Sequence, residues 1–323
     1  MKQNNLKKWL VLMLVLALVM SMGACAKTEA QDPDAARSAC AQVLMDHTTE
    51  PVCGSVGGDW VALGFARGDA DVPEAWFDRN YEAVESYVKS CDGVLHDRKY
   101  TEYSRVILAL TAIGKDPRDV AGFNLLVPLA DFEQTVFQGV NGPAFALLAL
   151  DSGNYEMPEN VAGRTQATRE GYVAYILDAE ISGGGWSLAG GAAEVDLTAM
   201  TLQALAKYQD REAVAAAVER GLAFLSENQN EAGGFTSYGA QSSEAISQTI
   251  VALTELGVSL NDSRFVKKGN TLVDALLQFQ QEDGSFSHVL DGQTDLLSTE
   301  QAYYALVAAN RAAQGESSLY RMK

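Results

Sequence analysis

Polar and aromatic residues that could bind a ligand recur at fixed distances from a repeated pair of residues. The pair is a small residue followed by a large one, as in Ala252-Leu253. Nine positions before the large residue, three repeats hold Asn141, Asp196 and Glu244. Five positions before it, four repeats hold Trp60, Arg105, Gln248 and Gln301, and nearby tyrosines are Tyr103, Tyr303 and Tyr304. Residues four apart share one face of a helix, so these side chains predict a binding surface with polar and aromatic lining.

The first of these sets also suits a structural role. Asn141, Asp196 and Glu244 stand near expected helix starts, where such residues accept hydrogen bonds from free backbone N–H groups. Helix capping and ligand contact therefore remain equal interpretations for these three residues. The longer side chains of the second set are poorer caps, although a solvated position is still open for them.

A second repeat separates the expected helices. It consists of an acidic or amide residue, three residues, a glycine, one residue and an aromatic residue. Its three copies contain Glu180, Gly184 and Trp186, then Gln229, Gly233 and Phe235, and finally Gln280, Gly284 and Phe286. The aromatic residues are 49 and 51 positions apart, and amphipathic helical patterns flank each copy. This period predicts a series of repeated helix pairs.

The small-large pair of residues extends the pattern to six helix pairs. First helices are expected at 38–47, 74–91, 128–139, 164–180, 211–229 and 262–280. The second helices of the last three pairs are expected at 195–209, 242–257 and 298–315. Each pair can bury its apolar face only against its neighbours. We therefore expect the six pairs to close into a double ring of inner and outer helices.

The second repeat resembles the QW motif of the prenyltransferase and squalene-cyclase (squalene-oxidase type) repeat family. The resemblance covers about residues 164–313, with phenylalanine twice in place of tryptophan and Glu180 in place of glutamine. It implies an all-α fold, the α/α toroid, shared with protein prenyltransferase β subunits, terpenoid cyclases and transcobalamin-type carriers. It also implies a structural motif, in which the amide binds backbone groups, the glycine permits positive φ and the aromatic ring packs on outer helices.

One stretch points to catalysis. Residues 194–199 are similar to the acid motif of squalene-hopene-type cyclases, in which the residue matching Asp196 is the general acid that protonates an alkene. Glu194 replaces the first acid of that motif and Leu197 the third. The chain also has room for one toroid domain, where those cyclases have two. Asp196 is therefore an alternative catalytic residue, and no catalytic residue is assigned first.

No metal site and no cofactor are predicted. The zinc of protein prenyltransferases needs Asp, Cys and His ligands, and no cysteine follows Cys91. The exported carriers of this fold pair the toroid with a small β domain that has no counterpart here. The resemblance thus implies capture of an unknown small or amphipathic ligand, such as a corrinoid, an isoprenoid or a peptide.

The N-terminus has the pattern of a bacterial lipoprotein signal. Three lysines precede an apolar run from Trp9 to Met20, and small residues then lead to Cys25. The similarity to a lipobox implies a signal peptide of residues 1–24, lipidation of Cys25 and an extracytoplasmic protein anchored to the bacterial cell membrane. An ordinary cleaved signal with Cys25 uninvolved is the alternative. Residues 25–37 are then a polar tether and residues 38–323 the toroid.

Charge and cysteines limit the partners further. The formal net charge of −18 excludes nucleic acid, because phosphate binding needs a basic surface. Anionic lipid headgroups do not attract such a surface either, so the acyl chains on Cys25 must hold the protein to its membrane. An exported chain permits disulfides. Because neighbouring outer helices of a toroid would run parallel, we expect Cys53 and Cys91 near one end of the ring and bonded to each other.

The sequence therefore predicts a membrane-anchored binding protein that holds its ligand at the mouth of the toroid. One alternative is a terpenoid-cyclase-like enzyme that uses Asp196, and another is a non-catalytic structural or adhesion module. An open polar mouth would favour binding. An apolar cavity around a buried Asp196 would favour the enzyme, and a lumen filled by side chains would favour the structural module.

Overall fold

The computed structural model describes residues 32–188, 190–237 and 239–323. The chain divides into two units, residues 1–32 and 33–323, and the helices and strands below belong to the second. The predicted signal peptide of residues 1–24, the lipidation site Cys25 and the first part of the tether lie outside the described residues. Helix α2 (Pro33–His47) begins five residues before the predicted toroid boundary, so residues 33–37 are helical and do not form a tether.

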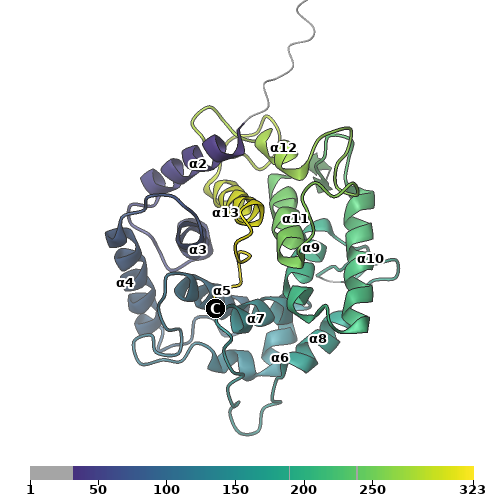
Figure 1. Cartoon of the computed structure of the whole chain (residues 1–323). Helices are drawn as coiled ribbons and strands as arrows, with labels where there is room; N and C mark the ends of the chain where they lie inside the picture. Colours follow the sequence, from purple (N-terminus) through teal and green to yellow (C-terminus); the bar gives the residue numbers. More distant parts are fainter. Residues whose placement is uncertain (1–31, 189, 238) are drawn as a thin grey trace, which may run out of the picture. The chain divides into compact units, whose positions relative to one another are not determined.

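Helix pairs surround a common centre in two layers (Figure 1). The inner helices are α3 (Trp60–Arg67), α5 (Thr101–Ala112), α7 (Asn141–Ser152), α9 (Val195–Leu205), α11 (Ser243–Leu256) and α13 (Leu296–Ala313). The outer layer consists of α2, α4 (Glu74–Ser90), η2 (Val127–Ala130), α6 (Phe132–Thr135), η3 (Val136–Gln138), α8 (Arg169–Asp178), α10 (Glu212–Asn228) and α12 (Leu272–Leu277). Helix α13 packs against both α11 and α3, so the inner layer closes. The predicted all-α toroid of about six hairpins is confirmed.

The two layers differ in their residue patterns. In α11, every residue except Glu244 is buried, which is expected of a helix that has neighbours on all sides. In contrast, α4 buries only Trp76, Asn80, Val84 and Val88, which lie four residues apart and form one stripe. Inner and outer helices can therefore be told apart from their sequences.

The three QW-like units join successive outer helices. Trp186 is fully buried, and its Nε1 donates a hydrogen bond to the carbonyl of Ile176 at 2.7 Å. Glu180, at the end of the first unit's outer helix, binds Arg220 of the next outer helix, with Oε1 at 2.6 Å from Nε. Gly184 has a φ of 100°, and a Cβ there would lie 2.7 Å from the Arg220 carbonyl oxygen. These contacts give the first unit a structural role.

The other two units make the same kind of contact. The Nε2 of Gln229 donates to the carbonyl of Phe265 at 3.0 Å, ahead of α12. The Nε2 of Gln280 donates to the carbonyl of Ala36 in α2 at 3.0 Å, which ties the last outer element to the first. The aromatic residues Phe235 and Phe286 are fully buried. Each outer element therefore ends beside the start or middle of the next one, in an inclined arrangement that Figure 1 shows.

Two expectations about this layer are wrong. The last outer helix was expected at 262–280, but only Leu272–Leu277 are helical, because residues 257–271 form turns that include positive φ values at Lys268 and Gly269. Cys53 and Cys91 are free thiols, as is Cys40, so the expected disulfide is not formed. The Sγ of Cys91 donates to the carbonyl of Val88 at 3.4 Å instead. Burial raises the pKa of the Cys53 thiol, and the nearby Cys91 acts in the same direction, so the two cysteines do lie close together as expected although they are not bonded.

The C-terminal segment fills the centre of the ring from one end. Residues 314–323 turn back after α13 toward the centre (Figure 1). Buried Glu255 of α11 accepts hydrogen bonds from the backbone N of Tyr320 at 2.9 Å and from the Oγ of Ser318 at 2.7 Å. Arg67 of α3 donates to the carbonyl of Leu319 at 3.0 Å. These bonds hold two buried side chains, Leu319 and Tyr320, in the lumen. Among the described helices, none has the length and apolar character that crossing a membrane requires.

Candidate functional site

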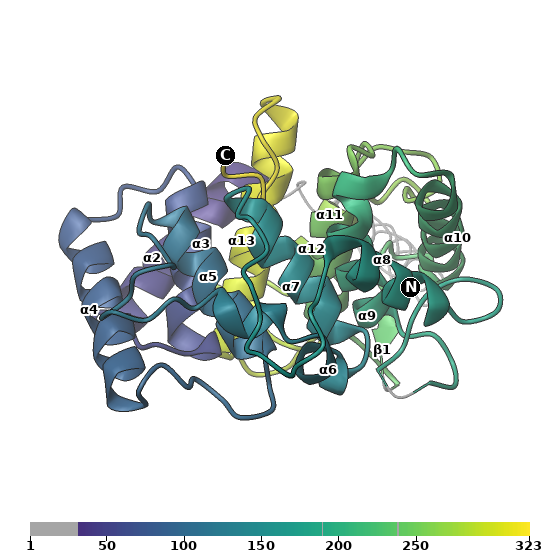
Figure 2. The same ribbon diagram turned by 90° about the horizontal axis from the view of Figure 1, so that it is seen from below.

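The segments that lead from each outer element to the next inner helix form a continuous collar. We define the collar as the described residues of six segments, namely 48–59, 91–100, 136–140, 179–188 with 190–194, 229–237 with 239–242, and 278–295. Neighbouring segments touch: the backbone N of Thr101, where α5 begins, donates to Gln138 at 3.2 Å, and that of Ser243 donates to the His288 carbonyl at 3.1 Å. Every inner helix starts at this collar, which therefore surrounds the N-terminal end of the inner ring. We call this end the mouth, and Figure 2 shows it edge-on, with β1 (Thr236–Ser237) on its side.

Glutamines and an aromatic cluster fill the lumen below the mouth. Gln248 accepts a hydrogen bond from Gln203 at 2.9 Å, and its Nε2 donates to Gln301 at 2.9 Å and to the hydroxyl oxygen of Tyr304 at 2.6 Å. This network joins three inner helices, α9, α11 and α13. The ring of Trp60 lies 6.0 Å from that of Phe145 and 6.1 Å from that of Tyr304. Four predicted site residues, Trp60, Gln248, Gln301 and Tyr304, are thus brought together. Gln248 and Tyr304 are buried, however, and already form hydrogen bonds within the protein.

The other predicted tyrosines lie elsewhere. The hydroxyl of Tyr103 accepts a hydrogen bond from the backbone N of Leu95 at 3.1 Å, so Tyr103 holds the second collar segment in place. The ring of Tyr303 lies 5.5 Å from that of Phe65, in the core against α3. Both tyrosines are buried. A Cβ on Gly68 would lie 2.7 Å from the Tyr303 hydroxyl oxygen, so Tyr303 reaches the C-terminal end of α3 and lies away from the mouth.

Arg105 is neutralised inside the protein. Its Nε donates to Asp59 at 2.7 Å and its Nη1 to Glu102 at 2.7 Å, and both Arg105 and Asp59 are buried. Burial raises the pKa of Asp59 to about 6, although the charge of Arg105 acts in the opposite direction. The sequence therefore placed Arg105 correctly at the mouth but missed the acid that binds it.

A second buried acid that the sequence did not point to lies beside this pair. Glu300 of α13 is fully buried, and its Oε2 accepts a hydrogen bond from the backbone N of Gly57 at 3.0 Å. Burial raises the pKa of Glu300 to about 8. One carboxyl oxygen of Glu300 and one of Asp59 have no hydrogen-bond partner among the described residues. Glu300 follows Ser298 and Thr299 and precedes Gln301, so the polar local sequence gave no sign that this residue is buried.

Asp196 is the predicted residue whose chemistry is most unusual. Its Oδ1 is buried and has no hydrogen-bond partner among the described residues. Burial raises the pKa of Asp196 to about 6, and the nearby negative charges of Glu244 and Glu194 act in the same direction. Asp196 lines a pocket of about 250 Å³ with Phe224 and Thr236, between α9 and α10. It therefore offers a hydrogen-bonding group that the protein itself leaves unused.

Glu244 lies close enough to influence Asp196 but has its own partners. Its Oε1 accepts a hydrogen bond from Ser298 at 2.5 Å, and its Oε2 one from Ser242 at 2.8 Å and contacts the Nδ1 of His288 at 2.7 Å. The contacts of Ser298 and His288 with Glu244 could not be read from the sequence because they join neighbouring repeats, whereas Ser242 lies two residues before Glu244 and caps the same helix. The arrangement holds the Glu244 carboxyl in one place at the edge of the mouth.

The capping interpretation does not hold for the three residues at helix starts. Helix α11 is capped by Ser242, whose side chain accepts from the backbone N of Ala245, and not by Glu244. No side-chain cap bond is recorded at the start of α9 or of α7, where Asp196 and Asn141 lie. The Oδ1 of Asn141, like that of Asp196, is buried without a partner among the described residues. Ligand contact therefore remains open for Asn141 and Asp196.

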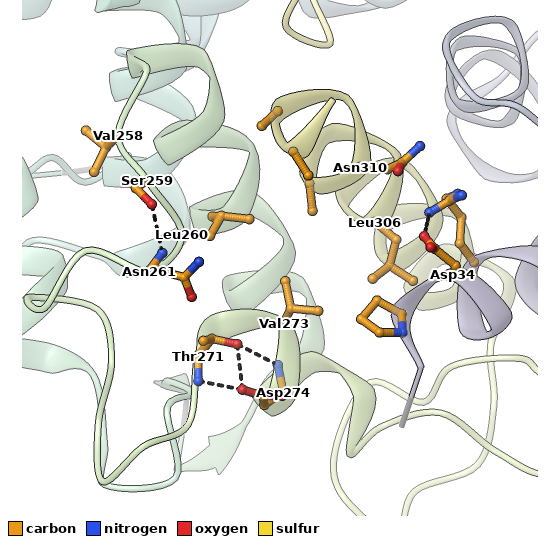
Figure 3. Close-up of a pocket in the computed structure, with 15 residues that line it drawn as sticks. Asp34, Val258, Ser259, Leu260, Asn261, Thr271, Val273, Asp274, Leu306 and Asn310 are labelled. Carbon is orange, nitrogen blue, oxygen red and sulfur yellow. Dashed lines mark hydrogen bonds and ion pairs between the residues drawn. The ribbon is translucent and has the colours of Figure 1, made fainter. Parts of the chain in front are cut away.

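A pocket of about 490 Å³ lies at the opposite end of the ring (Figure 3). It exists because α12 is short and because α13 presents small side chains there, including Ala309 and Ala313. Val258, Leu260 and Val273 make its walls largely apolar. No predicted site residue lines this pocket, so it is separate from the mouth.

The two ends of the ring differ strongly in charge. The collar contains eleven acidic residues against two basic ones, a formal balance of −9. The acids are Glu50, Asp59, Asp92, Asp97, Glu180, Glu194, Glu231, Glu282, Asp283, Asp291 and Asp295, and the bases are Arg98 and Lys99. The segments at the opposite end, residues 68–73, 113–126, 153–168, 206–211, 257–271 and 314–323, contain nine acidic and ten basic residues. Three of the collar acids pair with bases outside it: Asp59 with Arg105, Glu180 with Arg220 and Glu231 with Lys268. The collar remains acidic after these pairs are taken into account, so the mouth attracts cations.

Comparison with known proteins supports the fold. No protein-family profile matches the chain, and no curated protein matches its sequence. A solved protein from Actinoplanes is similar in structure, with a TM-score of 0.56 and 16% identity over 87% of this chain and 100% of that one. A type II terpene cyclase from Scytonema has a TM-score of 0.53 and 14% identity over 79% and 86% of the two chains. Unsaturated glucuronyl hydrolase from Bacillus sp. GL1, responsible for the degradation of glycosaminoglycan, has a TM-score of 0.55 and 11% identity over 89% and 97%. Likenesses at these identities show the toroid fold alone.

Proposed function

We propose that the protein binds a small or amphipathic ligand at the mouth of the ring, beside Asp196. The observation that carries this proposal is the buried Asp196 oxygen without a partner, at the wall of a pocket. A buried polar atom left without a hydrogen bond costs about 1–3 kcal/mol, so a ligand that donates a hydrogen bond there recovers that energy. The unpaired Asn141 oxygen offers a second acceptor at the mouth.

Binding fits the lumen better than a terpenoid-cyclase reaction does. Protonating an alkene needs a carboxylic acid that stays protonated inside an apolar cavity. Burial does raise the pKa of Asp196 to about 6, but the pocket beside it is lined by the polar residues Glu194, Asn228 and Thr236. The lumen is filled by the Gln203, Gln248 and Tyr304 network from one side and by the C-terminal segment from the other. A filled lumen also favours the structural or adhesion alternative. That alternative, however, gives no role to the unpaired carboxyl oxygen of Asp196.

Acid–base catalysis on the bound ligand is the second candidate function. Asp196 and Glu244 are near neighbours in unlike surroundings, one with an unpaired oxygen and the other held by Ser298 and His288. Pairs of carboxyl groups in unlike surroundings often divide the roles of acid and base. A pKa near 6 would let Asp196 exchange a proton near neutral pH. Two of the structural neighbours are enzymes, the cyclase and the hydrolase named above.

We also propose that the chain is a member of the QW-repeat family and a lipoprotein anchored outside the cytoplasm through Cys25. The contacts of the three QW-like units support the first statement, and the lipobox-like sequence before Cys25 supports the second. Expression of the full chain with Cys25→Ser should move the protein from the membrane fraction to the soluble fraction. Retention in the membrane fraction would contradict the anchor.

The binding proposal is tested by mass spectrometry of small molecules that remain on the protein after native purification. Wild-type chain, Asp196→Asn and a Val161→Ser control, altered at the opposite end, are purified in parallel. We expect a molecule that is retained by the wild type and the control and lost from Asp196→Asn. Equal retention by all three proteins would overturn the assignment of Asp196.

A further inference from the structure

Large apolar side chains are exposed around the collar. Six of them lie in the collar or in the first turn of the helix that follows it, and they come from five of its six segments. They are Val52, Val56, Val94, Phe137, Leu188 and Leu297, which we call the rim. The rim side chains are 38–56% exposed. They are far apart in sequence but share one end of the ring.

Exposed apolar residues are common on protein surfaces when they are scattered singly. The rim is different because its members gather at one end of the molecule. Neighbouring rim segments also touch, since a Cβ on Gly139 would lie 2.8 Å from the Leu188 carbonyl and one on Gly57 would lie 3.2 Å from Leu296. At the opposite end, the large apolar residue with comparable exposure among the described residues is Val161, at 66%. The rim therefore has the character of an interaction surface.

The negative charge of the collar indicates what kind of partner the rim would bind. The collar has a formal balance of −9, and its bases Arg98 and Lys99 come from a single segment. The guanidinium of Arg98 already lies over the Phe137 ring at 4.0 Å. Bases outside the collar pair with three of its acids, namely Asp59, Glu180 and Glu231, and the other acids leave the collar with a net negative charge. Apolar contacts surrounded by acidic residues favour a partner with apolar side chains flanked by lysine or arginine.

We propose that the rim docks a segment of a partner polypeptide that carries apolar and basic side chains, and this rests on the proposed binding function of the mouth. Two other occupants fit less well. Anionic lipid headgroups meet a surface of the same sign, and a second copy of the chain would bring two acidic collars face to face. A single small molecule would leave most of the rim exposed, because the rim draws on five segments of the collar.

The test uses fluorescence anisotropy with a labelled amphipathic peptide built from leucine and lysine. The matched control peptide replaces lysine with glutamate. The full chain is compared with the double variant Leu188→Ser/Leu297→Ser and with Val161→Ser, which removes an apolar residue outside the rim that is even more exposed. Circular dichroism and thermal unfolding confirm that each variant is folded. Vesicles of phosphatidylcholine with phosphatidylglycerol serve as the membrane probe.

We expect the leucine–lysine peptide to bind, and its affinity to fall with added salt because charges contribute. The double variant should weaken binding roughly tenfold, since two partly buried leucine contacts are lost, and Val161→Ser should leave it within about twofold. Equal binding of the glutamate peptide, equal effects of the two variants, or binding of vesicles but not of the peptide would each overturn the proposal. If the peptide fails to bind while a small molecule is retained by the wild type and lost from Asp196→Asn, the rim proposal fails and the binding function stands.

Discussion

Arg105 of α5 donates a hydrogen bond from its Nε to the Oδ2 of Asp59 at 2.7 Å, across the boundary between two repeats. Asp59 is the last residue of η1 (Ser55–Asp59), directly before α3, so the pair fixes the start of one inner helix against the next. Both side chains are buried, and Glu102 shares the guanidinium. The mouth is therefore held by a buried charge cluster at the point where α3 and α5 begin.

Replacing Arg105 with methionine should destabilise the protein strongly. The substitution leaves Asp59 buried without its partner, and breaking a buried ion pair in this way costs about 3–5 kcal/mol. Urea unfolding measures the change in the free energy of unfolding. The exposed pair of Arg118 with Asp116, also at 2.8 Å, gives the matched control. Arg118→Met should change stability by less than about 1 kcal/mol, and a similar effect of the two variants would contradict the importance of the buried pair.

Glu300→Gln should remove a pH dependence from stability. The pKa of Glu300 rises to about 8 in the folded protein, against about 4.3 in an unfolded chain. Because the folded state holds this proton more tightly, the group contributes stability at low pH, and that contribution is lost as the pH rises toward 8. The free energy of unfolding of Glu300→Gln should therefore exceed that of the wild type by more at pH 8 than at pH 5. Thermal unfolding at both values measures it, and a gain independent of pH would argue against a protonated Glu300.

Asp196→Asn should stabilise the protein near neutral pH while it impairs binding. The pKa of Asp196 rises to about 6, so its ionised form costs stability that a neutral amide avoids. We expect a gain of about 1–2 kcal/mol in the free energy of unfolding at pH 7, and little change near pH 3, where the carboxyl is largely protonated in both states. Chemical unfolding at the two pH values provides the comparison. A loss of stability at pH 7 would mean that the carboxylate has a structural role.

Trp186→Phe should separate packing from hydrogen bonding in the first QW-like unit. The two other copies have phenylalanine, so the ring should still fill most of its site. The lost bond from Nε1 leaves the Ile176 carbonyl without its donor, at a cost of about 1–3 kcal/mol. Trp186→Ala should cost more, about 3–5 kcal/mol, because it also empties the site. Equal stability of the wild type and both variants in urea would show that the unit is not structural.

Much of the fold follows from the sequence because repeats constrain it. The small residues before Leu205, Leu253 and Leu306 mark inner helices that need close packing, and this pattern located all six pairs. The extent of α12 could not be predicted, since residues 262–271 of the expected helix 262–280 form turns. The pattern placed Cys53 and Cys91 near each other, but it could not show that both remain free thiols.

The site could be predicted only in part. Spacing placed Trp60, Gln248 and Gln301 together, because they occupy equivalent positions in their repeats, and Tyr304 follows Gln301 by three residues on the same helix. It could not show that Gln248 is already bonded, nor that Asp59 and Glu300 are buried, because both depend on contacts between repeats. Exposure of the rim is likewise a property of the assembled ring.

Hydrogen–deuterium exchange measures most directly where this protein binds. The natively purified chain is compared before and after its bound molecule is removed by chromatography under mild conditions. We predict slower exchange with the molecule present in residues 190–200 and 242–248 and in the collar segments beside them, and no change in residues 257–271. Protection confined to residues 257–271 and 306–313, around the opposite pocket of Figure 3, would contradict binding at the mouth.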